Sequence, residues 1–170
     1  MAPAPLEKLK VVVIDDNEHM RTLLRAMLTG LGFRHIHVEE NGKAGFAALQ
    51  KVKPDLVLTD FSMQPVDGVE FVRMVRGLNS PLAWVPVIMI TGHNERHYIE
   101  QARDSGATEI LTKPVSPRDL FLRFKEVIER PRPFVKAPSF IGPDRRRKRL
   151  PASQYPKRRQ ADFDVEVEFR

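Results

Sequence analysis

Several apolar stretches of the sequence end in polar residues that could do chemistry together. In chain order these residues are Asp15 and Asp16, Asp60, Thr91 and Lys113. Three carboxylates in one partly buried cleft would repel one another unless a cation neutralised them. Mg²⁺ suits such a cleft, because it accepts one or two carboxylates and reserves a position for a phosphate oxygen. The set therefore indicates phosphoryl transfer, which asks a protein for positioning and for cations near the transferred oxygens.

The five residues divide into roles by their type and arrangement. Asp15 and Asp16 are adjacent and could hold a metal, whereas Asp60 stands alone at the end of its apolar stretch. Asp60 is therefore the better candidate for a carboxylate nucleophile. Lys113 could supply a second cation and Thr91 a hydroxyl donor.

The elements that must position these residues alternate along the chain. Apolar, β-branched stretches predict strands, and apolar positions at helical spacing predict helices. The strands are expected over 9–14, 34–38, 56–59, 85–90 and 108–111, and the helices from Asn17 to Gly32, over 43–51, 69–75 and 94–105, and from Ser116 to Ile128. Five such pairs predict a doubly wound α/β fold, a five-stranded parallel sheet with helices on both faces. Sites in these sheets lie beyond the carboxyl ends of the strands, where the polar residues stand.

Length and composition limit the class of protein. At 170 residues the chain is long enough for one ordinary domain. It has no cysteine, which excludes disulfides and thiolate metal sites. Its apolar runs are far shorter than the roughly 20 residues that span a bilayer, and its start lacks the features of a secretion signal. We expect a cytoplasmic protein with no membrane segment.

The residues after Arg130 differ in composition from the rest. Residues 1–130 carry 17 basic and 17 acidic side chains, whereas 131–170, the C-terminal extension, carry 11 and 5. The extension is rich in proline and arginine, which is typical of an extended segment. Three interpretations stay open: a solvated disordered segment, a basic segment that binds an acidic protein or, nonspecifically, nucleic acid, and a terminal strand near 162–169 that pairs with a sheet edge of its own domain, of a second copy or of a partner.

Four motifs resemble the CheY-like receiver domains of bacterial response regulators, here of a stand-alone type with a basic extension. They are VVVIDDN at 11–17, LTDFSMQPVDG at 58–68, IMITGH at 88–93 and ILTKPVS at 110–116. One acidic pair would mean little, but four motifs in order at these separations are highly specific. The resemblance covers residues 7–130, and the strand order 2-1-3-4-5 is taken from it.

The resemblance implies a role for each matching residue. Asp60 would accept a phosphoryl group from a histidine kinase or a phosphotransfer protein, with Mg²⁺ as cofactor. The other implied roles are metal binding by Asp15 or Asp16 with Asp60 and the main-chain carbonyl of Ser62, a switch hydroxyl on Thr91, phosphate contact by Lys113, and a cis peptide bond at Lys113–Pro114.

The sequence departs from the family pattern in two places. Receivers often carry an aromatic residue three positions before the lysine, whereas this chain has Ile110, so signalling through backbone shifts around Thr91 is the alternative to an aromatic gate. Pro65 also falls one place later than usual, which indicates a different turn after Asp60. Ser62 and His93 match the variable positions that tune phosphoryl lifetime in this family.

The resulting hypothesis is a response regulator without a DNA-binding output domain. It would promote its own phosphorylation and dephosphorylation rather than act as an enzyme on other molecules, and would signal by docking through about 94–129 or by passing the phosphoryl group onward. Its downstream partner is not indicated, and a homodimer stays open. The alternatives are a receiver-fold platform whose basic extension binds an acidic partner or nucleic acid independently of phosphorylation, and a hydrolase with an aspartyl-phosphate intermediate.

Overall fold

Five parallel strands form the central sheet of the computed structural model, in the predicted order β2-β1-β3-β4-β5. The structure describes residues 5–138 and 140–144, together with the backbone of 166–168. The strands are β1 (Lys10–Ile14), β2 (His35–Glu39), β3 (Leu56–Asp60), β4 (Val87–Thr91) and β5 (Glu109–Thr112). The predicted doubly wound α/β fold is confirmed.

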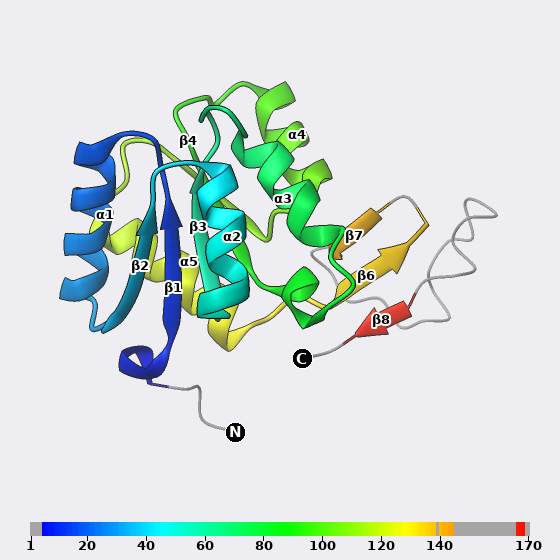
Figure 1. Ribbon diagram of the computed structural model, residues 1–170, viewed down its shortest axis with the longest axis horizontal. Helices are drawn as coiled ribbons and strands as arrows, with labels where there is room; N and C mark the ends of the chain where they lie inside the picture. Colours follow the sequence, from blue (N-terminus) through cyan, green and yellow to red (C-terminus); the bar gives the residue numbers. More distant parts are fainter. Residues whose placement is uncertain (1–4, 139, 145–165, 169–170) are drawn as a thin grey trace.

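Helices cover both faces of the sheet (Figure 1). They are α1 (Glu18–Gly30), α2 (Gly42–Val52), α3 (Gly68–Arg76), α4 (Arg96–Ser105) and α5 (Pro117–Glu129), with short 3-10 helices η1 (Leu6–Lys8) and η2 (Pro81–Trp84). One core lies under α1 and α5, and a second core lies under α2, α3 and α4. None of the described helices is both long and apolar enough to cross a membrane.

The continuous apolar strands follow from this two-sided covering. In β1, Val11 and Val13 are buried in the core under α1 and α5, whereas Val12 and Ile14 are buried in the opposite core. Because successive side chains of a strand point to opposite faces, a strand buried on both faces contains apolar residues at every position. The prediction of a parallel sheet rested on this pattern.

Side chains cap the helices where the sequence predicts. The Asn17 side chain accepts a hydrogen bond from the main-chain N–H of Met20 at 3.0 Å, and the Ser116 hydroxyl accepts one from that of Asp119 at 3.1 Å. Each bond satisfies one of the backbone donors left unpaired at a helix start. These caps place the loops after β1 and β5, which carry acidic and basic residues of the predicted site.

The composition of the C-terminal extension is typical of a linker, but part of the extension is folded. It forms a second, antiparallel sheet of β6 (Phe134–Ala137), β7 (Phe140–Pro143) and β8 (Glu166–Glu168), in the order β7-β6-β8. The β6–β7 hairpin lies beside the end of α3 (Figure 1), and Phe134 is buried there. The terminal strand expected near 162–169 lies partly outside the described residues, and its described part pairs with β6 rather than with the central sheet.

Candidate metal centre at the carboxyl ends of the strands

Acidic and basic side chains meet beyond the ends of β1, β3 and β5. The Nζ atom of Lys113 lies 2.7 Å from Oδ1 of Asp60 and 3.8 Å from Oδ2 of Asp15. One oxygen each from Asp15, Asp16 and Asp60 fall within 4.8 Å of one another. Residues far apart in the sequence thus form one cluster, as the parallel sheet requires.

Main-chain hydrogen bonds continue just past the strand ends and fix the backbone positions from which these side chains extend. The main-chain N–H of Phe61 donates to the carbonyl of Ile90 at 2.8 Å, and that of Lys113 donates to the carbonyl of Thr91 at 2.7 Å. The residues that carry the cluster are therefore held by the same hydrogen-bond network as the strands themselves.

The Asp15 carboxylate is buried without full compensation. Its side chain is 1% exposed, and its Oδ1 accepts a hydrogen bond from the N–H of Asn17 at 2.8 Å. Its Oδ2 has no hydrogen-bond partner among the described residues. Burial is the main cause that raises the pKa of Asp15, and the nearby Asp60 raises it further. A buried carboxylate oxygen of this kind favours a nearby cation, and Asp15, Asp16 and Asp60 offer the oxygen ligands from which a Mg²⁺ ion could take one or two carboxylates.

The Asp60 carboxylate is held at both oxygens. Oδ1 faces Lys113, and Oδ2 accepts a hydrogen bond from the main-chain N–H of Ser62 at 3.0 Å. The start of α3 packs closely behind it, since a Cβ atom on Gly68 would lie 2.2 Å from the Asp60 carbonyl oxygen. Only glycine fits there, so the turn at Asp67 and Gly68 shapes the loop after Asp60.

The predicted switch hydroxyl is engaged by its own loop. Thr91 is buried, and its Oγ1 accepts a hydrogen bond from the main-chain N–H of His93 at 2.9 Å. The same hydroxyl donates to the carbonyl of His93 at 3.4 Å, and this donor bond would have to break for Thr91 to donate to a group attached to Asp60.

The remaining predicted residues lie around this cluster. The Lys113–Pro114 peptide bond is cis, as expected, and the Gln64–Pro65 bond is also cis, which the sequence did not predict. Ile110 is partly buried and packs on the core under α2, α3 and α4.

An aromatic group beside the site was not predicted. The Tyr98 ring stacks on His93 at a centroid distance of 4.2 Å and meets the edge of Phe61 at 5.5 Å. His97 lies on Tyr98 at 3.9 Å. Phe61 follows Asp60 and His93 stands two residues after Thr91, but no local pattern in the sequence links either residue to Tyr98 on α4.

The chain matches known families over most of its length. Residues 11–125 match the family described as Response regulator receiver domain. A probable chemotaxis protein CheY of Rhizobium etli is 34% identical over 108 residues, which are 64% of this chain and 83% of that protein. The transcriptional regulatory protein ResD of Bacillus subtilis is 33% identical over 71% of this chain but only 48% of its own length.

Solved structures show the same fold. The chemotaxis response regulator CheY4 of Vibrio cholerae superposes with a TM-score of 0.66 at 28% identity, covering 71% of this chain and 98% of that one. A CheY of Borrelia burgdorferi, solved in complex with CheX, BeF₃ and Mg²⁺, superposes with a TM-score of 0.64 over 70% and 88% of the two chains. At 21% identity this second likeness concerns the fold alone.

Proposed function

The chain belongs to the receiver-domain family of two-component response regulators, and from this premise we propose that Asp60 accepts a phosphoryl group in a Mg²⁺-dependent reaction. The donor is a phosphorylated histidine of a kinase or phosphotransfer protein, and we place the reaction in the cytoplasm. The observation that supports this most directly is the contact of Lys113 with Asp60, 2.7 Å long, beside the buried carboxylate of Asp15.

In the proposed reaction a carboxylate oxygen of Asp60 attacks the phosphorus atom. The new O–P bond forms as the P–N bond of the phosphohistidine breaks, and the electron pair of that bond stays on the histidine nitrogen. Lys113 neutralises charge on the transferred oxygens. Asp15, Asp16, Asp60 and the carbonyl of Ser62 are the proposed ligands of Mg²⁺, which supplies further positive charge when bound.

The proposed switch is a population shift that follows phosphorylation. The Thr91 hydroxyl stops donating to the His93 carbonyl and donates to a phosphoryl oxygen, while Lys113 moves from the carboxylate to the phosphoryl group. Because Ile110 stands where many receivers have an aromatic residue, the change passes through the backbone of the loop after β4. The surface formed by residues 94–129 then changes.

The proposed output is docking on a partner protein or onward transfer of the phosphoryl group. The described part of the extension after α5 forms the strands β6, β7 and β8, not a helical DNA-binding unit. The phosphorylated aspartate is also a reactive mixed anhydride, so the chain itself would promote both its formation and its hydrolysis. His93 and Ser62 are proposed to affect the lifetime of this group.

Phosphoryl incorporation into matched variants tests the proposal. The wild type and Asp60→Asn are incubated with acetyl phosphate or a phosphorylated kinase, with Mg²⁺ or with EDTA, and intact mass is measured. The wild type should gain one phosphoryl group only with Mg²⁺, and hydroxylamine should remove it. Asp55→Asn is the control, because Asp55 precedes β3 at the opposite end of the strand from Asp60. Equal incorporation into Asp60→Asn would reject Asp60 as the acceptor.

A further inference from the structure

A buried arginine links the starts of β4 and β5. Arg76, at the end of α3, is 3% exposed, and its guanidinium donates to the carbonyls of Ala83 at 2.8 Å, Val85 at 2.7 Å and Gly106 at 3.0 Å. Burial lowers the pKa of Arg76 to about 9, so the group stays charged at neutral pH. The two segments that lead into β4 and β5 are thus joined through one side chain.

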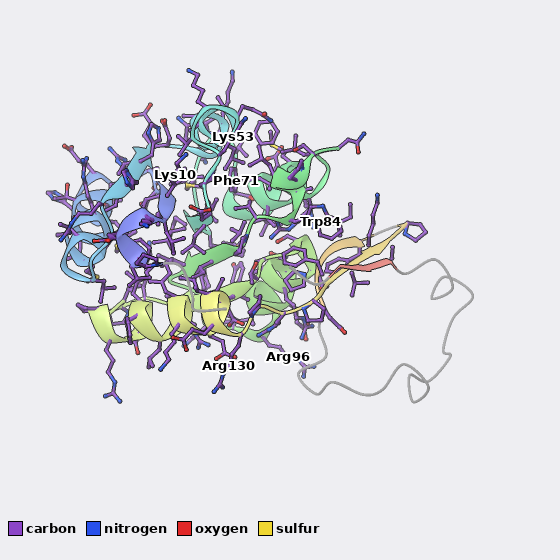
Figure 2. All side chains as sticks on the ribbon, turned by 90° about the horizontal axis from the view of Figure 1, so that it is seen from below. Lys10, Lys53, Phe71, Trp84, Arg96 and Arg130 are labelled. Carbon is purple, nitrogen blue, oxygen red and sulfur yellow. The ribbon has the colours of Figure 1, made fainter. Side chains whose placement is uncertain are left out.

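The extension covers this arginine. The Phe134 ring of β6 lies 5.0 Å from the Arg76 guanidinium carbon and meets the Trp84 ring at 5.6 Å. Phe134 is buried in this position. Figure 2 shows Trp84 next to the hairpin that follows α5. The aromatic contact gives the hairpin a fixed place on the receiver, because cation–π and edge-to-face contacts both depend on orientation.

The second contact is between backbones, at the end of α4. A Cβ atom on Gly106 would lie 2.6 Å from the carbonyl oxygen of Ile141, and one on Gly142 would lie 2.9 Å from the Cα of Gly106. Gly106 also has a φ of +100°, which favours glycine. With no side chain between the two backbones, a shift of α4 toward the hairpin would produce a clash and a shift away would lose the contact.

A buried carboxylate fixes the segment that leads to the hairpin. Glu109, at the start of β5, pairs with Arg123 of α5 at 3.3 Å and with Arg132, which precedes β6. Glu109 is 8% exposed, so the two arginines together neutralise a buried charge. The docked hairpin, residues 132–144, therefore contacts the amino ends of the same strands whose carboxyl ends carry Thr91 and Lys113.

We propose that the surface formed by Arg76, Trp84 and Gly106 is an intramolecular docking site for residues 132–144, and that phosphorylation of Asp60 weakens this docking. The proposal rests on the proposed function. Its steps are physical. A phosphoryl group on Asp60 would take the contact that Lys113 now makes with the carboxylate, and the hydrogen that Thr91 Oγ1 now donates to the His93 carbonyl. The loop after Thr91 leads into α4, whose C-cap is Gly106. Displacement of this rigid helix is incompatible with the close backbone contact at Gly142.

Hydrogen exchange of the full-length chain tests the proposal. The probe is beryllofluoride with Mg²⁺, which mimics an aspartyl phosphate. A small three-stranded sheet with few buried apolar side chains is marginal in water without packing on another element, so its amides are protected chiefly while it is docked. Exchange in residues 134–143 should become about fivefold faster or more when beryllofluoride binds, the lower end of usual coupling between sites. Asp60→Asn should show no change.

Reciprocity supplies the second measurement. If phosphorylation and docking oppose each other, weakening the dock must tighten beryllofluoride binding by a corresponding factor. Phe134→Ala removes the ring over Arg76. Gly142→Val introduces a clash with the Cα of Gly106 and with the Phe140 ring of the same hairpin, and the Gly106 backbone cannot move aside as a ring can. Both variants should bind beryllofluoride more tightly than the wild type. Lys136→Ala is the matched control, because Lys136 is exposed on the same strand.

Trp84 gives an independent signal, because it is the only tryptophan of the chain. Its emission should move to longer wavelength when beryllofluoride releases Phe134, and this shift should be absent in Phe134→Ala. The proposal is overturned if beryllofluoride binds while exchange in 134–143 is unchanged or slower, or if Phe134→Ala and Gly142→Val bind it as the wild type does. Absence of beryllofluoride binding to the wild type would instead reject the proposed function, and this inference with it.

Discussion

At the scale of single residues, burial of the Asp15 carboxylate opposes folding of the metal-free chain. Because burial raises its pKa in the folded chain above the ordinary 3.8, the folded state holds this proton more tightly than the unfolded state. Protonation of the Asp15 carboxyl therefore stabilises the folded chain at low pH. This stabilisation is lost as pH rises from about 3.8 through the pKa of Asp15 in the folded state. At neutral pH the full cost of the buried charge remains.

Asp15→Asn should therefore stabilise the metal-free protein at pH 7. The gain should appear as a higher Tm at pH 7, and it should shrink toward pH 4 as the wild-type carboxyl becomes protonated. Mg²⁺ should raise the Tm of the wild type but not that of the variant. Thermal unfolding with Mg²⁺ or EDTA checks this, with Glu18→Gln as the control, since Glu18 is an exposed carboxylate outside the proposed ligand set. A metal-free Asp15→Asn protein that melts below the wild type would contradict the argument.

A second residue-scale prediction concerns the Thr91 hydroxyl. Thr91→Val keeps the shape but removes the group that accepts from His93 and would donate to a phosphoryl oxygen. We expect phosphoryl incorporation on Asp60 to persist, while the shift of Trp84 emission with beryllofluoride is lost. Thr91→Ser should keep both. If the valine variant shows the full emission shift, the hydroxyl is not needed for switching.

At the scale of elements, the Arg76 side chain donates hydrogen bonds to three main-chain carbonyls that would otherwise lack this donor. Arg76→Met would leave the carbonyls of Ala83, Val85 and Gly106 without this donor, at a total cost of about 3 kcal/mol or more. Arg76→Lys should recover only part, because an ammonium group cannot reproduce the planar fork. Urea unfolding measures this loss. Arg73→Met, an exposed arginine of the same helix, should stay within about 0.5 kcal/mol of the wild type.

The elements could be predicted from the sequence, but the contacts of Arg76 could not. Alternation and helical spacing predicted the elements of the receiver to within about two residues, as with 69–75 for Gly68–Arg76, since those patterns follow from burial on the sheet. Arg76 itself looks like any charged residue at a helix end, because its partners come from η2 and the end of α4. Those carbonyls belong to the main chain, so the residue types at these positions do not indicate the contact with Arg76.

The candidate site was predictable for a different reason. Asp15, Asp60 and Lys113 each follow an apolar strand, so the topology alone brings them together. The Tyr98 ring group was not predictable, because its contacts with His93 and Phe61 depend on the placement of α4. The docked hairpin was missed because proline and charge dominate its composition, and Phe134 is its main buried apolar residue.

At the scale of the whole molecule, a receiver of zero net charge carries an extension of net charge +6. The docked hairpin attaches the extension to the receiver. Deleting the extension therefore distinguishes the phosphorylation of Asp60 from the docking of the hairpin. Deleting residues 131–170 uncovers Trp84 and Arg76 and leaves Glu109 with Arg123 alone. The buried Phe134 ring is worth about 2 kcal/mol of unfolding free energy, so the truncated chain should melt several degrees lower.

The truncated chain should nevertheless keep Mg²⁺-dependent phosphorylation of Asp60, because the described side-chain partners of that carboxylate belong to the receiver. It should also bind beryllofluoride as tightly as Phe134→Ala does, since both lack the docking contact that opposes the phosphorylated arrangement. Intact mass after acetyl phosphate treatment and a beryllofluoride titration measure the two effects. A truncated chain with native circular dichroism but no phosphoryl incorporation would show that the extension takes part in the chemistry, because loss of docking alone should favour the phosphorylated state.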